Sequence, residues 1–500
     1  MIGILLNDNA YEQDIRELLM AFFPGEDFVY EAAPALEFCV SGILNQERTK
    51  FQLQVIFRGK RSWYLWDATP AEKKEWDRFD EPIPVDYENR TETKNKIKRR
   101  LYVILRALTG RKMPWGSLTG IRPVKIALTR LGQGMAEEEI QEYMKDTYFA
   151  SEEKIRLCLE IARKERALLG PALGGEGGFR HDGYSLYVGI PFCPTTCLYC
   201  SFTSYPIGKW GGRVQEYLAA LFQELEYVAR TRGRRPSCVY VGGGTPTSLT
   251  AEDLEKLLDK LTVLFDCGGA GEFTVEAGRP DSITGEKLKV LKKYGVSRIS
   301  INPQTMNQKT LDLIGRCHKV EEVEARFYLA RELGFDNINM DLIVGLPGED
   351  LVDVQRTMDS LRELSPDSLT VHCLAIKRAA RLNTMKEAYK DYKIVNSQGI
   401  VEMTARYARK MGLEPYYLYR QKNMAGNFEN VGYALPGKEC LYNILIMEEQ
   451  QTIVGCGAGT TTKRLIPGEN RIERAETVKN VEQYIGRVGE MIERKERLFG

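Results

Sequence analysis

The chain has 500 residues, more than one ordinary hydrophobic core accommodates, so two or three domains are expected. Hydrophobic residues make up 43% and charged residues 28%, and a formal net charge of +1 gives no bulk attraction to nucleic acids or anionic membranes. No apolar stretch approaches the roughly 20 residues that span a bilayer, and the amino terminus lacks a secretory signal. We therefore expect a cytoplasmic protein with no membrane insertion and no nucleic-acid partner.

The first third of the chain, residues 1–170, has the pattern of an α+β domain without a catalytic motif, so its role stays open. Apolar, aromatic-rich segments indicate strands at 36–44 and 51–66. Periodic apolar positions predict helices at 97–108 and 152–168.

After a glycine-rich linker at residues 171–183, short β-rich runs alternate with helical segments over residues 184–384. The runs are 185–191, 237–246, 272–278, 298–304, 337–347 and 368–376. Such βα units imply a parallel sheet covered by helices, with its strands buried on both faces. Six units fall short of the eight in a closed barrel. The sequence therefore predicts an α/β fold, an incomplete (βα)6 barrel or an open sheet, with active residues at the carboxyl ends of the strands.

The alternation stops near residue 385, and residues 385–500 predict an α+β extension that covers the barrel. Within it the pattern indicates a helix over 396–411, a β-hairpin region over 414–464 and an amphipathic helix over 475–498.

Three cysteines follow the first barrel strand in the segment YVGIPFCPTTCLYCSF. Cys193, Cys197 and Cys200 have the spacing C-x3-C-x2-C, for which packing alone gives little reason. An iron–sulfur cluster needs thiolates that converge on one small object, and three ligands leave one iron open for a small molecule. A structural zinc site usually needs a fourth ligand, and neither a fourth cysteine nor a histidine lies nearby in the sequence.

With these motifs the sequence resembles the radical S-adenosylmethionine superfamily and, within it, the oxygen-independent coproporphyrinogen III oxidase family, in particular its HemZ branch. The resemblance is close over residues 184–380 and weaker as far as residue 465. It implies that the three cysteines bind a [4Fe–4S] cluster whose open iron takes the methionine amino and carboxylate groups of S-adenosylmethionine. Reductive cleavage then yields a 5′-deoxyadenosyl radical that abstracts hydrogen from the substrate. An electron donor such as flavodoxin or ferredoxin is implied.

The resemblance also implies contacts to S-adenosylmethionine at the strand ends. Tyr187 lies where a tyrosine contacts the cofactor near the cluster, and Tyr199 takes the aromatic position beside the adenine. The other expected contacts are Gly242, Gly243, Gly244, Thr245, Glu276, Gln304, Arg316, Asp341 and Ala375. Among them the glycines let backbone approach the methionine ammonium, Arg316 fits the carboxylate and Asp341 the ribose hydroxyls. Each charged residue alone would be an ordinary ion-pair residue, but their joint placement favours a binding site.

Two positions depart from the best-understood oxidases of the family. Phe202 stands where those enzymes have a further cysteine, and Gly189 where they have a histidine. The leading interpretation is oxidative decarboxylation of two propionates of coproporphyrinogen III to vinyl groups, giving protoporphyrinogen IX. A haem chaperone of the HemW type and a radical haem methyltransferase are the alternatives. Modification of tRNA is disfavoured, because charge is balanced and no RNA-binding motif occurs.

Basic residues near the sixth strand are candidates for binding a tetrapyrrole substrate. Lys377, Arg378 and Arg381 follow that strand, and Arg420 with Lys422 forms a second basic group. Propionates need cations, and the planar guanidinium matches a carboxylate. We expect these residues to anchor the propionates; the alternative is that they are solvated surface charges.

Overall fold

The structure is a computed structural model that describes residues 1–31, 36–58, 65, 67–170, 183–377, 380–389, 391–421, 427–466, 469 and 471–500. It divides into two compact units. The first comprises Met1–Ala162, Asn396–Gln398 and Leu418–Glu429, and the second Arg163–Val395, Gly399–Tyr417 and Asn430–Gly500. The first boundary lies at residue 162 where residue 170 was expected, and the expected C-terminal extension contributes to both units. Of the expected linker, only Gly183 is described.

The first unit is built on a five-stranded sheet of order β2-β1-β3-β4-β5. Its strands are β1 (Ile2–Leu6), β2 (Phe28–Val29), β3 (Phe38–Leu44), β4 (Lys50–Phe57) and β5 (Ile83–Pro84). Its helices are α1 (Glu12–Phe22), α2 (Pro70–Trp76), α3 (Arg90–Thr109), α4 (Val124–Gly132), α5 (Glu137–Tyr148) and the first part of α6 (Glu152–Leu169). The two predicted helices correspond to α3 and α6. The strand predicted at 51–66 ends at Phe57.

The second unit contains an eleven-stranded sheet of order β14-β15-β13-β12-β11-β10-β9-β6-β16-β17-β18. Its central strands are β6 (Tyr184–Ile190), β9 (Cys238–Gly243), β10 (Glu272–Gly278), β11 (Arg298–Ile301), β12 (Ile338–Val344) and β13 (Ser368–Cys373). Neighbours among these strands pair in parallel. The predicted α/β fold with six parallel strands in an incomplete barrel is therefore confirmed.

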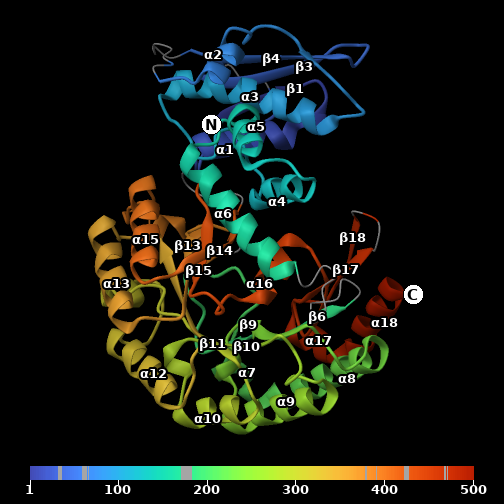
Figure 1. Cartoon of the computed structure of the whole chain (residues 1–500), viewed down its shortest axis with the longest axis vertical. Coiled ribbons are helices and arrows are strands. Elements are labelled where there is room, and N and C mark those ends of the chain that lie inside the picture. The colour runs from blue at the N-terminus through green and yellow to red at the C-terminus, as the bar shows by residue number, and fades with distance from the viewer. Residues whose placement is uncertain are drawn as a thin grey trace. The chain divides into compact units, whose positions relative to one another are not determined.

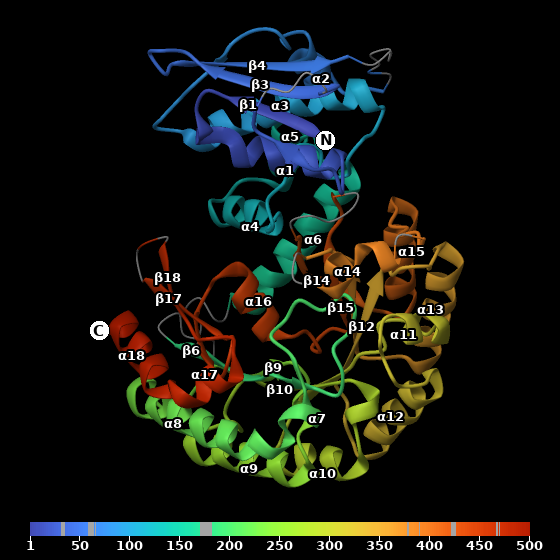
Figure 2. The same ribbon diagram turned by 180° about the vertical axis from the view of Figure 1, so that it is seen from behind.

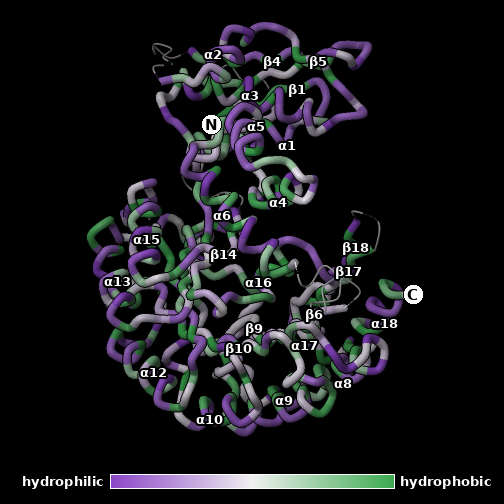
Figure 3. Tube along the Cα trace, viewed as in Figure 1, coloured by the Kyte–Doolittle hydropathy of each residue, from purple (hydrophilic) through white to green (hydrophobic). Residues whose placement is uncertain are grey.

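Helices follow the central strands and lie along the outer face of the sheet (Figures 1 and 2). They are α8 (Val214–Arg232), α9 (Ala251–Leu264), α10 (Gly285–Lys293), α11 (Gln308–Leu313), α12 (Val320–Glu332) and α13 (Leu351–Leu364). Side chains of Thr250, Thr284 and Asp350 accept backbone N–H groups and so cap the first turns of α9, α10 and α13. Hydrophilic residues recur along these outer helices, whereas the β9 and β10 region is more apolar, as burial of the strands requires (Figure 3).

The C-terminal elements differ from the expected hairpin and single helix. The region 414–464 contains β14 (Glu414–Tyr419), β15 (Asn430–Ala434), α16 (Leu441–Glu448), β16 (Thr452–Cys456) and the start of β17 (Thr461–Ile466). The helix predicted over 475–498 is replaced by the end of β18 (Arg471–Glu476), α17 (Val481–Gly486) and α18 (Val488–Phe499). The helix predicted over 396–411 is α15 (Gln398–Lys410).

These C-terminal strands extend both edges of the parallel sheet. β16 pairs in parallel with β6, and β15 pairs antiparallel with β13. The extension is therefore part of the same sheet and not only a cover. Within the described part of the chain, no helix is long and apolar enough to cross a membrane.

Candidate functional site

The three cysteines lie in one loop that leaves the carboxyl end of β6. The loop runs from β7 (Phe192–Cys193) to β8 (Tyr205–Pro206), and Cys193 and Cys197 are buried while Cys200 is partly exposed. The Cys200 backbone N–H donates to the Cys197 carbonyl at 3.2 Å. A bond from the Leu198 N–H to the Ile314 carbonyl at 2.9 Å anchors the middle of the loop. We call residues 193–200 the cluster loop.

Two thiols of this loop, those of Cys193 and Cys200, lie in surroundings that favour the neutral form. Burial raises the pKa of Cys193 to about 11 and also raises the pKa of Cys200. Cys193 Sγ lies 3.4 Å from Thr245 Oγ1, and Cys200 Sγ lies 3.9 Å from Ser204 Oγ. Among the described residues no three Cys, His, Asp or Glu side chains already form a group that could hold a metal ion. The donors are nevertheless three thiols, a soft set that suits an iron–sulfur cluster better than a hard cation.

The glycine-rich end of β9 packs directly against the cluster loop. A Cβ atom on Gly244 would lie 2.6 Å from the Phe192 carbonyl oxygen and 3.0 Å from Cys193 Sγ, so a side chain there displaces the loop. Gly243 has φ +111°, a conformation that other residues rarely adopt. The Gly244 N–H donates to the Ile190 carbonyl at 2.8 Å and the Thr245 N–H to the Phe192 carbonyl at 2.7 Å. Because these glycines have no side chains, the turn leaves backbone atoms accessible at the strand ends, where a cofactor ammonium could bind to carbonyl groups.

Glu276 is a partly exposed carboxyl group in β10, inside the barrel. Burial raises its pKa to about 7, although a hydrogen bond from the Tyr240 hydroxyl at 2.6 Å limits the rise. Tyr240 stacks on Tyr187 and on Tyr442, with ring centroids 5.9 and 4.5 Å apart. The expected contacts Tyr187 and Glu276 are thus brought together through the ring of Tyr240.

Gln304 and Arg316 supply buried polar atoms that the protein leaves without partners. Gln304 has φ +67°, and its Oε1 and the Arg316 Nε make no hydrogen bond within the described structure. Other Arg316 nitrogens donate to the Asn302 carbonyl at 2.6 Å and the Tyr199 hydroxyl at 3.3 Å. Buried polar groups are nearly always satisfied, so unpartnered ones indicate a polar ligand. A guanidinium beside a backbone cradle fits the amino-acid end of S-adenosylmethionine.

Asp341 lies in β12 and Ala375 follows β13. Burial would raise the pKa of Asp341, but the His372 imidazole at 3.9 Å and a hydrogen bond from Asn339 at 2.8 Å hold it below its usual range. The carboxylate is therefore charged at neutral pH and can accept hydrogen bonds from the hydroxyl groups of a ligand. Gln304 connects to this strand, since its N–H donates to the Asp341 carbonyl at 2.9 Å.

The basic residues expected to bind substrate separate into two groups. Lys377 is partly buried and Arg381 is exposed at the first position of α14 (Arg381–Thr384). The Leu382 N–H donates to the Leu198 carbonyl at 2.9 Å, so α14 adjoins the cluster loop. Arg378 and Lys422 lie outside the described residues.

Arg420 is not available to a substrate. It belongs to the first unit, is 4% exposed, and donates to the carbonyls of Leu118 at 2.7 Å, Gly120 at 3.2 Å and Asn427 at 3.2 Å. Burial lowers the pKa of Arg420 to about 10, so the guanidinium is still charged at neutral pH. Its hydrogen bonds stabilise the backbone of the neighbouring loops. The expectation that Arg420 binds propionates is therefore wrong, because its donors are already used.

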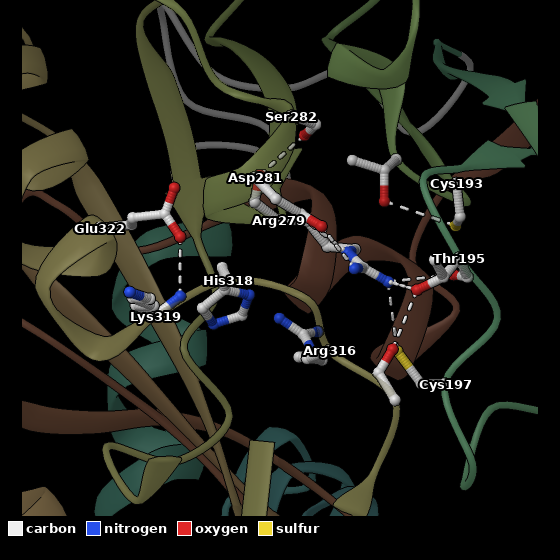
Figure 4. A network of polar contacts seen from close by, with 12 residues as sticks. Cys193, Thr195, Cys197, Arg279, Asp281, Ser282, Arg316, His318, Lys319 and Glu322 are labelled. Atoms are coloured by element: carbon white, nitrogen blue, oxygen red, sulfur yellow. Dashed lines mark hydrogen bonds and ion pairs between the residues drawn. The ribbon is translucent and has the colours of Figure 1, made fainter. Parts of the chain in front are cut away.

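Two residues near the cluster loop were not expected from the sequence. Arg279 donates to the cluster loop, and His318 lies beside Arg316 with both ring nitrogens unpartnered among the described residues (Figure 4). Burial, together with the charges of Arg316 and Arg279, lowers the pKa of His318 to about 4, so the imidazole is neutral at neutral pH. Arg279 directly follows β10, whereas His318 comes after α11 (Gln308–Leu313), and neither lies in a sequence motif that marks it as functional.

A pocket of about 330 Å³ opens beside the cluster loop. Its wall includes Tyr187 and Gly189 of β6, Phe202 after the last cysteine, Thr460 of the turn before β17, and Lys479. A Cβ on Gly189 would lie 2.6 Å from Thr460 Cγ2, so glycine permits the turn to approach β6. Phe202 is 77% exposed, which gives the pocket an aromatic rim.

Comparison with known proteins agrees with this arrangement. The model of the radical SAM superfamily matches residues 187–361. The chain is 38% identical over 484 residues to the oxygen-independent coproporphyrinogen-III oxidase-like protein HemZ of Bacillus subtilis, covering 96% of this chain and 93% of that protein. It is also 35% identical to the haem chaperone HemW of the same organism, covering 55% of this chain and 69% of that protein.

Among solved structures, coproporphyrinogen III oxidase (HemN) of Escherichia coli superposes with a TM-score of 0.50 and 26% identity, covering 62% of this chain and 70% of that one. The 38% identity to the oxidase-like protein extends over nearly the full length of both chains and therefore establishes the family. The chain therefore belongs to the radical SAM superfamily, in the family of oxygen-independent coproporphyrinogen-III oxidase-like proteins, whose cofactors are a [4Fe–4S] cluster and S-adenosylmethionine.

Proposed function

We propose that this protein is an oxidoreductase of tetrapyrrole metabolism that converts two propionates of coproporphyrinogen III to vinyl groups, giving protoporphyrinogen IX. The observation that carries the proposal is the 38% identity to an oxygen-independent coproporphyrinogen-III oxidase-like protein across 96% of the chain. That similarity includes the first unit and the C-terminal strands, not only the superfamily core. Each conversion releases CO₂, gives one hydrogen atom to the 5′-deoxyadenosyl radical and passes one electron to a separate one-electron acceptor.

The cofactor pair would supply the abstraction of hydrogen from the propionate, and the protein would supply placement. We propose that Cys193, Cys197 and Cys200 hold the cluster. Backbone of Gly242–Gly244 and Thr245 would receive the methionine ammonium, while the Arg316 guanidinium would bind the carboxylate. Acceptors and apolar surface for the nucleoside would come from Glu276, Gln304, Asp341, Tyr187, Tyr199 and Ala375.

We propose that the tetrapyrrole binds in the pocket beside the cluster loop. Its aromatic rim at Phe202 and its ammonium at Lys479 suit a flat ring system that carries carboxylates. Lys377 and Arg381 would bind further propionates, a role supported by the contact of α14 with the cluster loop. Partial burial lowers the pKa of Lys377, but pairing with a carboxylate would favour its charged form. Arg378 remains a candidate beside them.

Reduction of the cluster needs a one-electron donor, for which we propose a flavodoxin or ferredoxin. The cytoplasm, where such carriers are found with reduced thiols, is the proposed location. The free state of all described cysteines agrees with that setting.

A second candidate function is haem transfer, as named for the HemW proteins. It is favoured by 35% identity to HemW of Bacillus subtilis over 278 residues. Phe202, in place of the further cysteine expected for the oxidases, also favours this second candidate.

Product analysis distinguishes the candidates. The cluster-loaded protein would be reduced under anaerobic conditions, supplied with S-adenosylmethionine and coproporphyrinogen III, and the products analysed by mass spectrometry. The proposal expects loss of two CO₂ units and appearance of 5′-deoxyadenosine. Stable binding of haem without a chemical change supports the chaperone, and an opened, methylated tetrapyrrole from haem supports the methyltransferase.

Lys377→Ala combined with Arg381→Ala should reduce porphyrinogen turnover while leaving uncoupled cofactor cleavage nearly intact.

A further inference from the structure

Arg279 ties the cluster loop to the end of β10. The side chain is 3% exposed and follows that strand directly. Its Nη1 donates to the Thr195 carbonyl at 3.0 Å and to Thr195 Oγ1 at 2.7 Å. The same nitrogen lies 3.7 Å from Cys197 Sγ, within reach of a weak hydrogen bond to sulfur (Figure 4). One guanidinium nitrogen thus contacts both the backbone of the loop and a thiol expected to bind iron.

Asp281 fixes the direction in which Arg279 points. Arg279 Nε donates to Asp281 Oδ1 at 3.0 Å and Nη2 to Oδ2 at 2.6 Å, a bidentate pair. Burial would lower the pKa of Arg279, but the hydrogen bonds to Asp281 raise it above its usual value, so the cation is retained. With two nitrogens committed to the carboxylate, Nη1 is left facing the cluster loop.

The same contacts reach the segment that carries Arg316. Thr195 Oγ1 donates to the Gly315 carbonyl at 2.9 Å, one residue before Arg316. Ser282 Oγ donates to the Arg279 carbonyl at 2.7 Å and so holds the turn that carries the guanidinium. Arg279 is therefore a buried cation whose position is determined from both sides.

We infer that Arg279, oriented by Asp281, is a positioning residue that aims Cys197 at the cluster and raises the reduction potential of the cluster. Charge and hydrogen bonds to the sulfurs are principal determinants of such potentials. A cation close to Cys197 Sγ favours the reduced cluster, which carries one more negative charge. Reduction before S-adenosylmethionine is cleaved thereby becomes easier for a one-electron donor. The inference rests on the proposed assignment of the three cysteines as cluster ligands.

The test compares reconstituted full-length protein with the variants Arg279→Gln and Arg279→Lys. Iron and sulfide content is measured first, and the potential is then determined by redox titration followed by electron paramagnetic resonance. Arg279→Gln should retain the cluster but lose at least about tenfold in its equilibrium preference for the reduced state, about 59 mV for a one-electron couple. Arg279→Lys, which keeps the charge, should stay closer to the parent protein.

Arg331→Gln is the matched control. Arg331 Nη1 also pairs with a carboxylate, Asp367 Oδ2 at 2.6 Å, but Asp367 precedes β13 and so lies at the opposite end of the strands from the cluster loop. Its potential should equal that of the parent protein.

The outcomes separate this inference from the cysteine assignment. An unchanged potential in Arg279→Gln overturns the inference. Loss of the cluster in both Arg279 variants overturns it as well, since that result assigns a purely structural role. If the parent protein itself binds no iron, the cysteine assignment fails and takes the inference with it.

Discussion

At the scale of single residues, the cluster-loop cysteines differ from the other cysteines in their setting. Cys238 and Cys373 are fully buried within β9 and β13, as small apolar side chains commonly are. Cys197→Ala should therefore remove nearly all iron and all cofactor cleavage, because two thiolates do not hold a cubane cluster. Cys238→Ala and Cys373→Ala should keep both. Iron and sulfide assays with electron paramagnetic resonance give the answer, and a full cluster in Cys197→Ala would contradict the assignment.

Glu276 gives a prediction for pH dependence. Its pKa of about 7 means that the carboxyl gains charge between pH 6 and pH 8. An ionised carboxylate accepts ribose hydroxyls and attracts an ammonium better than the neutral acid. Affinity for S-adenosylmethionine should therefore rise from pH 6 to pH 8, by up to about tenfold for a group with this pKa. Calorimetric titration of the cluster-loaded protein at both pH values measures the change.

Two variants test the pH prediction. Glu276→Gln should flatten the dependence. Asp341→Asn should move the dependence to lower pH, because the Asp341 charge contributes to the raised pKa of Glu276. If Glu276→Gln retains the slope of the parent protein, another group is responsible.

The cysteine motif and the strand-end residues could be identified from sequence because each follows a recognisable strand. Arg279 and His318 could not, because their importance lies in contacts across the chain. Arg279 reaches Cys197, 82 positions away in the sequence. Arg420 was misjudged for the same reason, since its carbonyl partners at Leu118 and Gly120 lie about 300 positions away.

At the scale of elements, the six central strands were predictable and the C-terminal strands were not. Buried parallel strands are short apolar runs separated by helices, a pattern that sequence shows directly. β16 (Thr452–Cys456) is equally apolar, but its parallel partner is β6, far earlier in the chain. A hairpin between sequence neighbours was the local expectation; β16 does pair antiparallel with β17, but its parallel pairing with β6 joins the hairpin to the barrel sheet.

The turn after β9 provides a prediction at this scale. A Cβ at position 244 meets the Phe192 carbonyl oxygen at 2.6 Å, and backbone cannot rotate away as a flexible side chain can. Gly244→Ala should therefore displace the cluster loop and weaken S-adenosylmethionine binding more than tenfold while the protein stays folded. Gly268→Ala is the control, since a Cβ there meets nothing within 4 Å. Binding affinity and circular dichroism separate the two effects, and parent-like affinity in Gly244→Ala would show that the turn tolerates a side chain.

At the scale of the whole barrel unit, a buried ion pair joins the C-terminal helix α18 to the first barrel helix α8. Lys495 and Glu224 are 1% and 0% exposed, and their side chains form a close ion pair. Glu224 also accepts the Tyr484 hydroxyl and, at 2.7 Å, the Gly457 N–H. Gly457 belongs to the turn between β16 and β17, near the pocket, so this carboxylate connects the end of the chain to the edge of the site.

Breaking that pair should destabilise the barrel unit. Lys495→Met leaves the Glu224 carboxylate buried without its cation, which costs about 3–5 kcal/mol. The pair Lys495→Met with Glu224→Gln should recover much of the loss, because no charge then stays buried and Tyr484 and Gly457 keep an acceptor. Arg487→Ala, which removes a solvent-exposed ion pair with Glu490, should change stability by less than about 1 kcal/mol. Denaturant unfolding of the parent protein, Lys495→Met, Glu224→Gln and the double variant measures the coupling between the two residues. If Lys495→Met is as stable as the parent protein, the ion pair with Glu224 does not contribute to the free energy of unfolding. In that case α18 is held in place by the packing of its apolar face alone.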